Sequence, residues 1–217
     1  MAAAAEPITP AALARLVADR ALALLDAGTR CPRVGIDGAV PRDTGELADR
    51  VCALLAQQGR AVARVRAADF LRSRSVRLEH GEQDPDSGYE RWFDHLALRR
   101  EVLDPLGPGG DLTWLPSLWD PVRDRATRAA RRTARPGSVL VLDGPFLLRW
   151  ETADAVDVGV LLQASEAAMV RRLDAADMAR TVGAWSRYVE ETCPQQRADV
   201  VVRVEHPDRP ALVRGTS

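Results

Sequence analysis

Short apolar segments alternate with helical patterns along most of this chain, and this alternation limits the folds that the chain can adopt. Val34–Asp37 is an apolar segment that ends in an acid, and a helix is expected over residues 46–57, closed by Gly59. Ala61–Ala67 follows as the next strand candidate. A strand, a helix and a strand in this order form a parallel pair joined by a right-handed crossover. The chain is therefore expected to contain a parallel sheet.

Three further apolar segments extend the expected sheet. Ser138–Asp143 has the apolar character of a buried parallel strand and ends in an acid, and Asp157–Leu162 and Ala198–Val204 are the remaining candidates. Helices are expected over residues 11–25, 94–103 and 165–180. This order predicts an α/β fold with a doubly wound, mainly parallel sheet flanked by helices. A ligand of such a sheet binds beyond the carboxyl ends of the strands.

The length of the chain, 217 residues, suits one compact α/β domain better than two. We expect an N-terminal helix within residues 1–30 that is part of the domain or packs on it, a single domain over residues 31–210, and a tail over residues 211–217. The polar stretch 72–90 carries Gly, Pro, Asp and Ser, and it predicts an exposed functional loop.

Charge and composition argue against several classes of partner. A formal net charge of −1 gives no reason to expect nucleic acid or an anionic membrane. No apolar run approaches the ~20 residues of a membrane span, and the N-terminus lacks the basic region of a signal peptide, so we expect a cytoplasmic protein. The cysteines (Cys31, Cys52, Cys193) and the histidines lack metal-type spacing, so no structural metal is expected.

Lysine is absent from the sequence, and arginine supplies every strongly basic side chain. Mechanisms that require a lysine amine are therefore excluded. Neither a Schiff base nor a phosphate-loop lysine can form in this chain.

Four short motifs occur in a fixed order along the chain: Val34–Gly38, Phe93–His95, Leu142–Gly144 and Arg197–Val202. They resemble the phosphate-loop entry, the Phe-Asp-His element beside the nucleoside, the Walker B strand end and the last strand of the uridine kinase family of P-loop nucleoside kinases. The resemblance covers residues 33–208. It implies a P-loop kinase-like fold and a nucleoside such as uridine or cytidine as ligand. It also implies ATP and Mg²⁺ as cofactors if the protein is active, with Asp143 as the candidate Mg²⁺ ligand.

The phosphate loop is the first place where this resemblance fails. A working loop reads G-x-x-x-x-G-K-[ST], in which backbone N–H groups and the Lys hold phosphates and the hydroxyl holds Mg²⁺. Counted from Gly38 without a gap, Asp43 replaces the second Gly, Thr44 the Lys and Gly45 the Ser or Thr. The carboxylate of Asp43 would repel phosphate. Arg42 as the positive charge and Thr44 as the hydroxyl are the candidate substitutes.

Two further groups of the resembled family are changed. The family's catalytic base is an Asp at a strand end where this chain has Ala68. Asp69 follows one residue later, and strand alternation points it elsewhere unless a one-residue bulge restores it as a substitute base. Arg171 and Arg172 match the paired lid arginines, but the Arg of the Arg-Asp pair that follows is replaced by Ala176.

The side chains expected beside the nucleoside are better preserved. The resemblance assigns Phe93 to base packing, Asp94 to the ribose hydroxyls, and the pair Trp119 and Asp120 to a position near the base. The side chains expected to complete a polar pocket are Tyr89, Arg72, Arg74 and Arg77. The residues predicted to line one cavity at the carboxyl edge of the sheet are Asp69, Asp94, Trp119 and Asp143.

Each assignment has an alternative structural explanation. Asp94 is equally well explained as a helix N-cap, and Trp119 as a core or rim aromatic. The arginines of the polar stretch are equally typical of a solvated loop face. Asp143 could be a plain strand-end carboxylate, but its position at the expected ligand edge of the sheet favours a binding role.

Two functions are compatible with this pattern. In the first, the protein binds a nucleoside or nucleotide and its ATP-dependent phosphorylation is weak, altered or lost, as in a pseudokinase. In the second, it is an active nucleoside kinase with a non-standard phosphate loop that uses Arg42, Thr44 and Asp69; a different reaction in the same pocket is a further alternative. The coincident loss of three phosphate-handling features favours the first function. The expected partner is a small molecule, and the sequence does not predict an oligomeric state.

Overall fold

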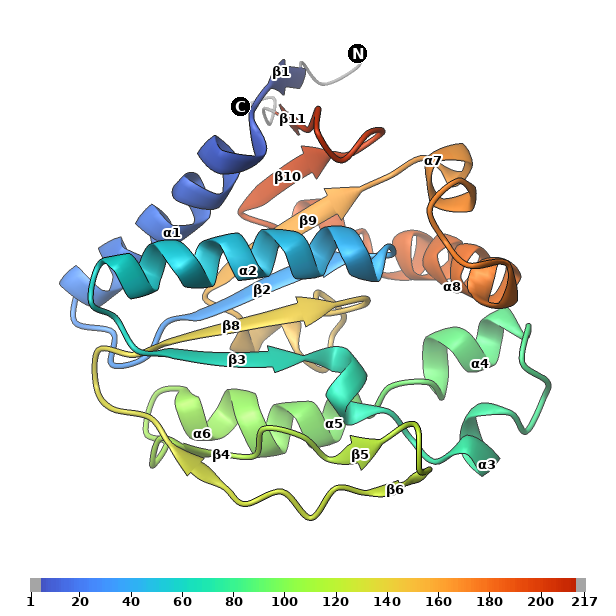
Figure 1. Ribbon diagram of the computed structural model, residues 1–217, viewed down its shortest axis with the longest axis horizontal. Coiled ribbons are helices and arrows are strands. Elements are labelled where there is room, and N and C mark those ends of the chain that lie inside the picture. The colour runs from blue at the N-terminus through green and yellow to red at the C-terminus, as the bar shows by residue number, and fades with distance from the viewer. Residues whose placement is uncertain (1–4, 214–217) are drawn as a thin grey trace.

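The protein is described here by a computed structural model that covers residues 5–213. One seven-stranded sheet runs through the molecule in the order β1-β11-β10-β9-β2-β8-β3 (Figure 1). Its strands are β1 (Ala5–Pro7), β2 (Arg33–Gly38), β3 (Val62–Arg66), β8 (Val139–Gly144), β9 (Val158–Gln163), β10 (Val200–Arg203) and β11 (Ala211–Val213). The five strands from β10 to β3 are parallel, whereas β11 is antiparallel to both of its neighbours. The predicted α/β fold with a mainly parallel sheet is confirmed.

The longer helices are α1 (Pro10–Asp26), α2 (Pro41–Gln57) and α8 (Ala175–Thr192). The shorter ones are η1 (Ala67–Phe70), α3 (Arg74–Arg77), α4 (Pro85–Glu90), α5 (His95–Leu98), η2 (Arg99–Leu103), α6 (Asp104–Leu106), η3 (Ala153–Ala155), α7 (Glu166–Val170) and η4 (Pro194–Gln196). Two small two-stranded antiparallel sheets pair β4 (Thr113–Trp114) with β7 (Arg132–Thr133) and β5 (Trp119–Asp120) with β6 (Arg125–Ala126). Among the described residues, no helix is long and apolar enough to cross a membrane.

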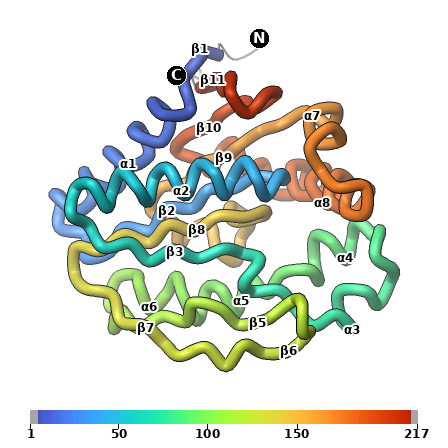
Figure 2. Tube along the Cα trace, viewed as in Figure 1, coloured from blue at the N-terminus to red at the C-terminus, as the bar shows by residue number. Residues whose placement is uncertain are grey.

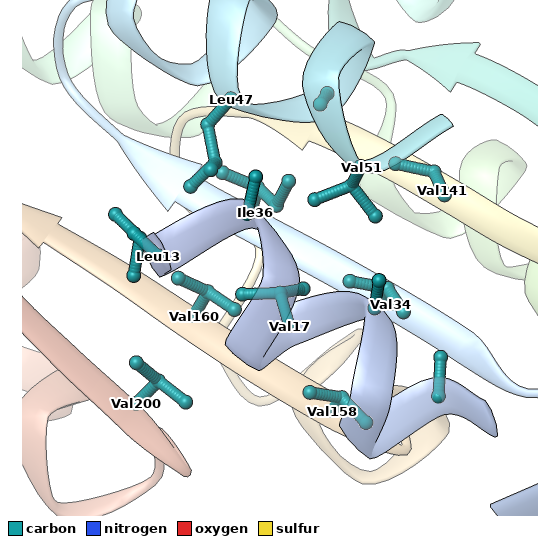
Figure 3. Close-up of a cluster of buried hydrophobic side chains, with 14 of the residues drawn as sticks. Leu13, Val17, Val34, Ile36, Leu47, Val51, Val141, Val158, Val160 and Val200 are labelled. Carbon is teal, nitrogen blue, oxygen red and sulfur yellow. The ribbon is translucent and has the colours of Figure 1, made fainter. Parts of the chain in front are cut away.

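Side-chain alternation along the strands builds a separate core on each face of the sheet. Val34 and Ile36 of β2 face α1 and α2, where they pack with Val17 and Leu47 (Figure 3). On the other face of the sheet, β8 packs against the α5–α6 segment and β9 packs against α8. Because strand residues alternate between the faces, Asp37 lies on the α8 face, next to Tyr188.

Both chain ends contribute to the sheet, as the adjacent blue and red segments in Figure 2 show. Thr9 caps α1 by accepting a hydrogen bond from the Ala12 N–H at 3.1 Å, and α1 packs in the core as expected. The expected tail is wrong for residues 211–213, which form β11; residues 214–217 lie outside the described part.

The expected helix over residues 165–180 is interrupted. It is divided into α7 and α8, with Asp174 in the extended N-cap conformation at the start of α8. Asp is favoured at this position, and its extended backbone is incompatible with a continuous helix. The expected loop over residues 72–90 also contains the short helices α3 and α4.

Candidate functional site

A cleft of about 800 Å³ opens beyond the carboxyl ends of β2, β8 and β3. Its walls come from the start of α2 and η1, from the α7–α8 connection, and from α4 and α8. This is the edge at which parallel sheets bind ligands.

The connection from β2 to α2 is shorter than the expected loop over residues 38–44. Only Ala39 and Val40 separate the two elements, because Pro41 already occupies the first helical turn, a position that Pro favours. Gly38 permits this tight turn, since a Cβ at that position would lie 2.9 Å from Thr44 Cγ2. The N–H groups of Asp43 and Thr44 both bond to the Val40 carbonyl, at 3.1 and 3.3 Å. The turn therefore lacks the open ring of N–H donors that cradles phosphates.

Gly45 of α2 lies close to Asp143 at the end of β8. A Cβ built on Gly45 would lie 3.7 Å from Asp143 Oδ2. Gly45 thus stands opposite the strand-end acid, where the resembled loop carries its metal-binding hydroxyl.

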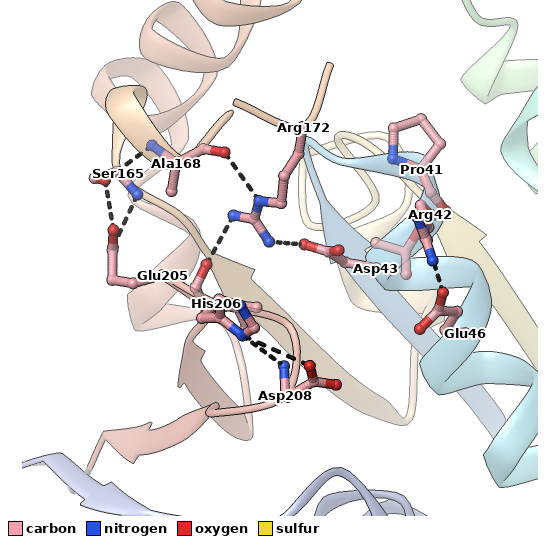
Figure 4. Close-up of polar contacts among 12 residues, drawn as sticks. Pro41, Arg42, Asp43, Glu46, Ser165, Ala168, Arg172, Glu205, His206 and Asp208 are labelled. Carbon is pink, nitrogen blue, oxygen red and sulfur yellow. Dashed lines mark hydrogen bonds and ion pairs between the residues drawn. The ribbon is translucent and has the colours of Figure 1, made fainter. Parts of the chain in front are cut away.

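Asp43 is paired with Arg172, one of the two predicted lid arginines (Figure 4). Arg172 donates to the Asp43 carboxylate and also to the carbonyls of Ala168 (2.9 Å) and Val204 (2.8 Å). The side chains of Arg172 and Asp43 are only 15% and 8% exposed. One predicted lid arginine therefore pairs with the protein's own carboxylate at the phosphate-loop position, whereas Arg171 is exposed and does not line the cleft.

Asp143 is also engaged within the protein. It accepts hydrogen bonds from Arg64 Nη1 on the neighbouring strand β3 and from Thr44 Oγ1 at 3.3 Å. The Arg64 guanidinium already supplies a cation to Asp143, the candidate Mg²⁺ ligand. Among the described residues, no group of three or more His, Cys, Asp or Glu side chains could hold a metal without a bound ligand. Mg²⁺ at a nucleotide is held by one or two carboxylates together with the ligand's phosphates, so the Arg64 ion pair would compete with the metal for Asp143. Arg64 was missed from the sequence, although an arginine inside a short buried strand is a usable signal.

At the end of β3 the chain enters η1 and presents Ala68, not Asp69, to the cleft. Burial raises the pKa of the Asp69 carboxyl above its ordinary value, an effect that the Arg66 N–H and charge oppose. Asp69 lies in η1, directly after β3, and does not line the cleft, so its assignment as a substitute base is not supported.

The prediction that four residues line one cavity is wrong, because only Asp143 of the four does so. Asp94 caps α5 by accepting from the Ala97 N–H at 2.9 Å. The Trp119 indole donates to Asp124 at 3.1 Å. The neighbouring Asp120 accepts from the N–H groups of residues 122 and 123 in a turn. These side chains thus form hydrogen bonds with nearby groups of the protein, which is a more common role than ligand binding.

Aromatic side chains form the floor of the cleft. Phe93 lines it together with Phe146, and the two ring centroids are 6.2 Å apart. Tyr89 does not line the cleft; it is buried edge-to-face against Phe146, with centroids 5.4 Å apart. Trp92 and Arg180 also line the cleft, and neither was identified from the sequence.

A buried carboxyl lies beside this aromatic cluster. Asp37 is 0% exposed, accepts hydrogen bonds from the Tyr188 hydroxyl and the Leu148 N–H (3.1 Å), and has one oxygen without a hydrogen-bond partner in the described structure. Burial raises the pKa of Asp37 from 3.8 to about 6, although the hydrogen bonds oppose the shift. The folded state therefore favours the protonated form of Asp37. The stability that this protonation contributes is fully present below pH 3.8 and is lost as the pH rises through about 6.

Tyr188→Phe should therefore destabilise the protein more at pH 7.5, where Asp37 is ionised, than at pH 5. A hydrogen bond to a charged group contributes about 1.5–3 kcal/mol, and we expect a loss of this size at pH 7.5. Urea unfolding of wild type and variant at both pH values measures the difference.

Tyr89→Phe is the matched control and should have the same effect at both pH values. The buried His95, whose pKa burial lowers to about 3, is present in every variant and cancels in the comparison. An equal cost of Tyr188→Phe at the two pH values would show that Asp37 does not titrate between them.

Comparison with known proteins supports the fold. No family model and no curated protein matches the sequence. A solved structure described as a possible uridine kinase from Bacillus stearothermophilus matches with a TM-score of 0.66 and 22% identity, over 84% of this chain and 97% of that chain. A protein assigned as a fructose transport system kinase from Silicibacter sp. TM1040 matches with a TM-score of 0.62 and 24% identity, over 85% of this chain and 95% of that one. The chain therefore has the fold of the P-loop kinases.

Proposed function

We propose that this protein is a uridine kinase-like protein that binds a nucleoside such as uridine or cytidine, and that its ATP-dependent phosphorylation is weak, altered or lost. The observation that carries the proposal is the Asp43–Arg172 ion pair at the two-residue connection between β2 and α2. It places a carboxylate and its internal partner where a working loop would hold phosphates. The aromatic half of the cleft, with Phe93 and Phe146, offers a surface for a base.

The alternative, an active kinase with a non-standard loop, has weaker support. Arg42 points to solvent with 84% of its side chain exposed and pairs with Glu46 at 2.8 Å. Thr44 bonds to Asp143, and Asp69 does not line the cleft. ATP and Mg²⁺ would be cofactors only under this alternative. The proposed partner is a small molecule in the cytoplasm, with no nucleic acid or membrane surface involved.

Calorimetric titration with uridine and cytidine tests the proposal. We expect measurable binding of at least one nucleoside to the wild-type protein. Loss of base stacking costs about 1–3 kcal/mol, so Phe93→Ala should weaken this binding about 10-fold. Leu96→Ala is the matched control, since this nearby side chain is 52% exposed and does not line the cleft. Absence of heat with both nucleosides would contradict the proposal.

A further inference from the structure

Phe146, on the floor of the cleft, has an unusual backbone conformation. Its φ of +65° lies in the left-handed region, which is sterically unfavourable for a bulky side chain. The turn that contains Phe146 follows β8, whose last residue, Gly144, has no room for a side chain, since a Cβ would lie 2.4 Å from Ala67 Cβ. Strained residues of this kind occur preferentially at ligand sites.

The carboxyl of Asp37, at the end of β2, explains this conformation. It lies on the α8 face of the sheet, whereas Asp143 bonds to α2 on the other face. The Leu148 N–H donates to Asp37 at 3.1 Å, and the N–H groups of Leu147 and Phe146 also favour its ionised form. A residue in the left-handed conformation makes successive N–H groups converge on one anion. The strain at Phe146 thus directs the N–H groups of its turn to the Asp37 carboxylate.

Tyr188 of α8 links the same carboxyl to the aromatic floor. Its hydroxyl donates to Asp37 and accepts from the Leu148 N–H at 3.2 Å. Its ring packs edge-to-face on Phe146, with centroids 5.2 Å apart. The Phe146 ring is therefore coupled to Asp37 both through the backbone of its own turn and through the ring of Tyr188.

We propose that Asp37 is a positioning residue for the ligand of the cleft, because its carboxylate holds Phe146 in the left-handed conformation that places the ring on the cleft floor. This inference rests on the proposed nucleoside binding and names the residue that fixes the surface for the base. Asp37 does not line the cleft itself and acts through Phe146. Loss of its charge weakens the hydrogen bonds of the turn, since charge-assisted hydrogen bonds are about twice as strong as neutral ones.

Asp37 changes charge between pH 5 and pH 7.5, because burial raises its pKa to about 6. The other titratable or charged side chains that pack around the turn are Tyr188, Tyr89, His95 and Arg149. Burial raises the pKa of both tyrosines and lowers that of His95 to about 3, so these three are neutral at both pH values. Arg149 is ion-paired with Glu151. A comparison of pH 5 with pH 7.5 therefore reports on Asp37.

The chain has three phenylalanines, so NMR of protein labelled only at phenylalanine tests the inference without a ligand. At pH 7.5 we expect nuclear Overhauser effects between the Phe146 ring, assigned with Phe146→Leu, and the Tyr188 ring. In Asp37→Asn at pH 7.5, and in wild type at pH 5, the Phe146 signals should shift and these effects should weaken. Phe70, buried in the core on the α5–α6 side, is the control and should not change. If Asp37→Asn does not fold, the wild-type comparison still carries the test.

Calorimetry with uridine, which is neutral at both pH values, measures the effect on binding. When the binding-competent conformation is only fractionally populated, the affinity falls by that fraction. We expect wild type to bind uridine about 10-fold more weakly at pH 5 than at pH 7.5, since the left-handed conformation is disfavoured by about this factor once it is released. Asp37→Asn should show the weaker affinity at both pH values. Asp19→Asn, at an exposed position of α1 outside the cleft, should keep the pH dependence of wild type.

The results separate this inference from the proposed function. Phe146 signals that are the same at the two pH values and in Asp37→Asn would overturn the inference. Equal uridine affinity of wild type and Asp37→Asn at pH 7.5 would also overturn it and leave nucleoside binding intact. Absence of uridine binding to wild type at both pH values would contradict the proposed function, and the NMR comparison would still decide whether Asp37 holds Phe146.

Discussion

Purified wild-type protein is expected to phosphorylate uridine and cytidine with ATP at least about 1,000-fold more slowly than an active P-loop nucleoside kinase assayed beside it. A single arginine that stabilises the transferring phosphoryl group can contribute a factor of about 10³ or more. Here Arg172 is bonded to Asp43, the lysine is absent, and Ala68 lines the cleft where the resembled family carries its base. Turnover at ordinary kinase rates in a coupled ADP-release assay would contradict the proposed function.

The triple change Asp43→Gly, Thr44→Lys, Gly45→Ser should separate ATP binding from turnover. Removing the carboxylate and adding a lysine should raise ATP affinity by about 10- to 100-fold, since one charged hydrogen bond contributes about 1.5–3 kcal/mol. Turnover should stay low until Ala68→Asp is added. If wild type proves active, Arg42→Ala shows whether that arginine replaces the lysine.

Arg172→Ala should lower the free energy of unfolding by about 3–5 kcal/mol, because it leaves the largely buried Asp43 carboxylate without its cation. It also removes hydrogen bonds to the carbonyls of Ala168 and Val204, which tie the lid to the last part of the sheet. Urea unfolding at pH 7.5, followed by circular dichroism, measures the loss.

Two variants make this measurement specific. Arg171→Ala removes the exposed neighbouring charge and should change the stability by less than about 0.5 kcal/mol. Adding Asp43→Asn to Arg172→Ala should recover part of the loss, because the buried charge is then removed. A cost below about 1 kcal/mol for Arg172→Ala would show that the Asp43–Arg172 pair does not hold the lid.

The central part of the sheet could be predicted because β2, β8 and β9 are buried on both faces and therefore have continuous apolar sequences, as in Val139–Gly144. The register of the phosphate loop counted from Gly38 stays a prediction, and the position of Gly45 opposite Asp143 is compatible with it. The expected start of α2 at residue 46 is too late. Pro41 is the local signal for the earlier start, because proline is favoured in the first turn of a helix.

The side chains that line the cleft could not be predicted as well as the sheet. Asp94 and Asp120 accept hydrogen bonds from backbone N–H groups two or three residues away. An Asp side chain is equally suited to such a local hydrogen bond and to ligand binding, so the sequence alone does not distinguish the two roles. The pairs Arg64–Asp143 and Asp43–Arg172 join segments far apart in the chain. Their contacts depend on how the strands and the lid are placed in space, which residue spacing alone does not define.

The most direct test of the closed phosphate site is a calorimetric titration of wild-type protein with ATP and Mg²⁺, repeated with ATP and EDTA. Asp43 is paired with Arg172, and Asp143 with Arg64 and Thr44, so neither a phosphate nor a metal finds a free partner of opposite charge at the start of α2. The structure predicts that Mg²⁺ does not strengthen ATP binding, so the titrations with Mg²⁺ and with EDTA should give the same heat. Micromolar binding of ATP that requires Mg²⁺ and is abolished by EDTA would contradict the account.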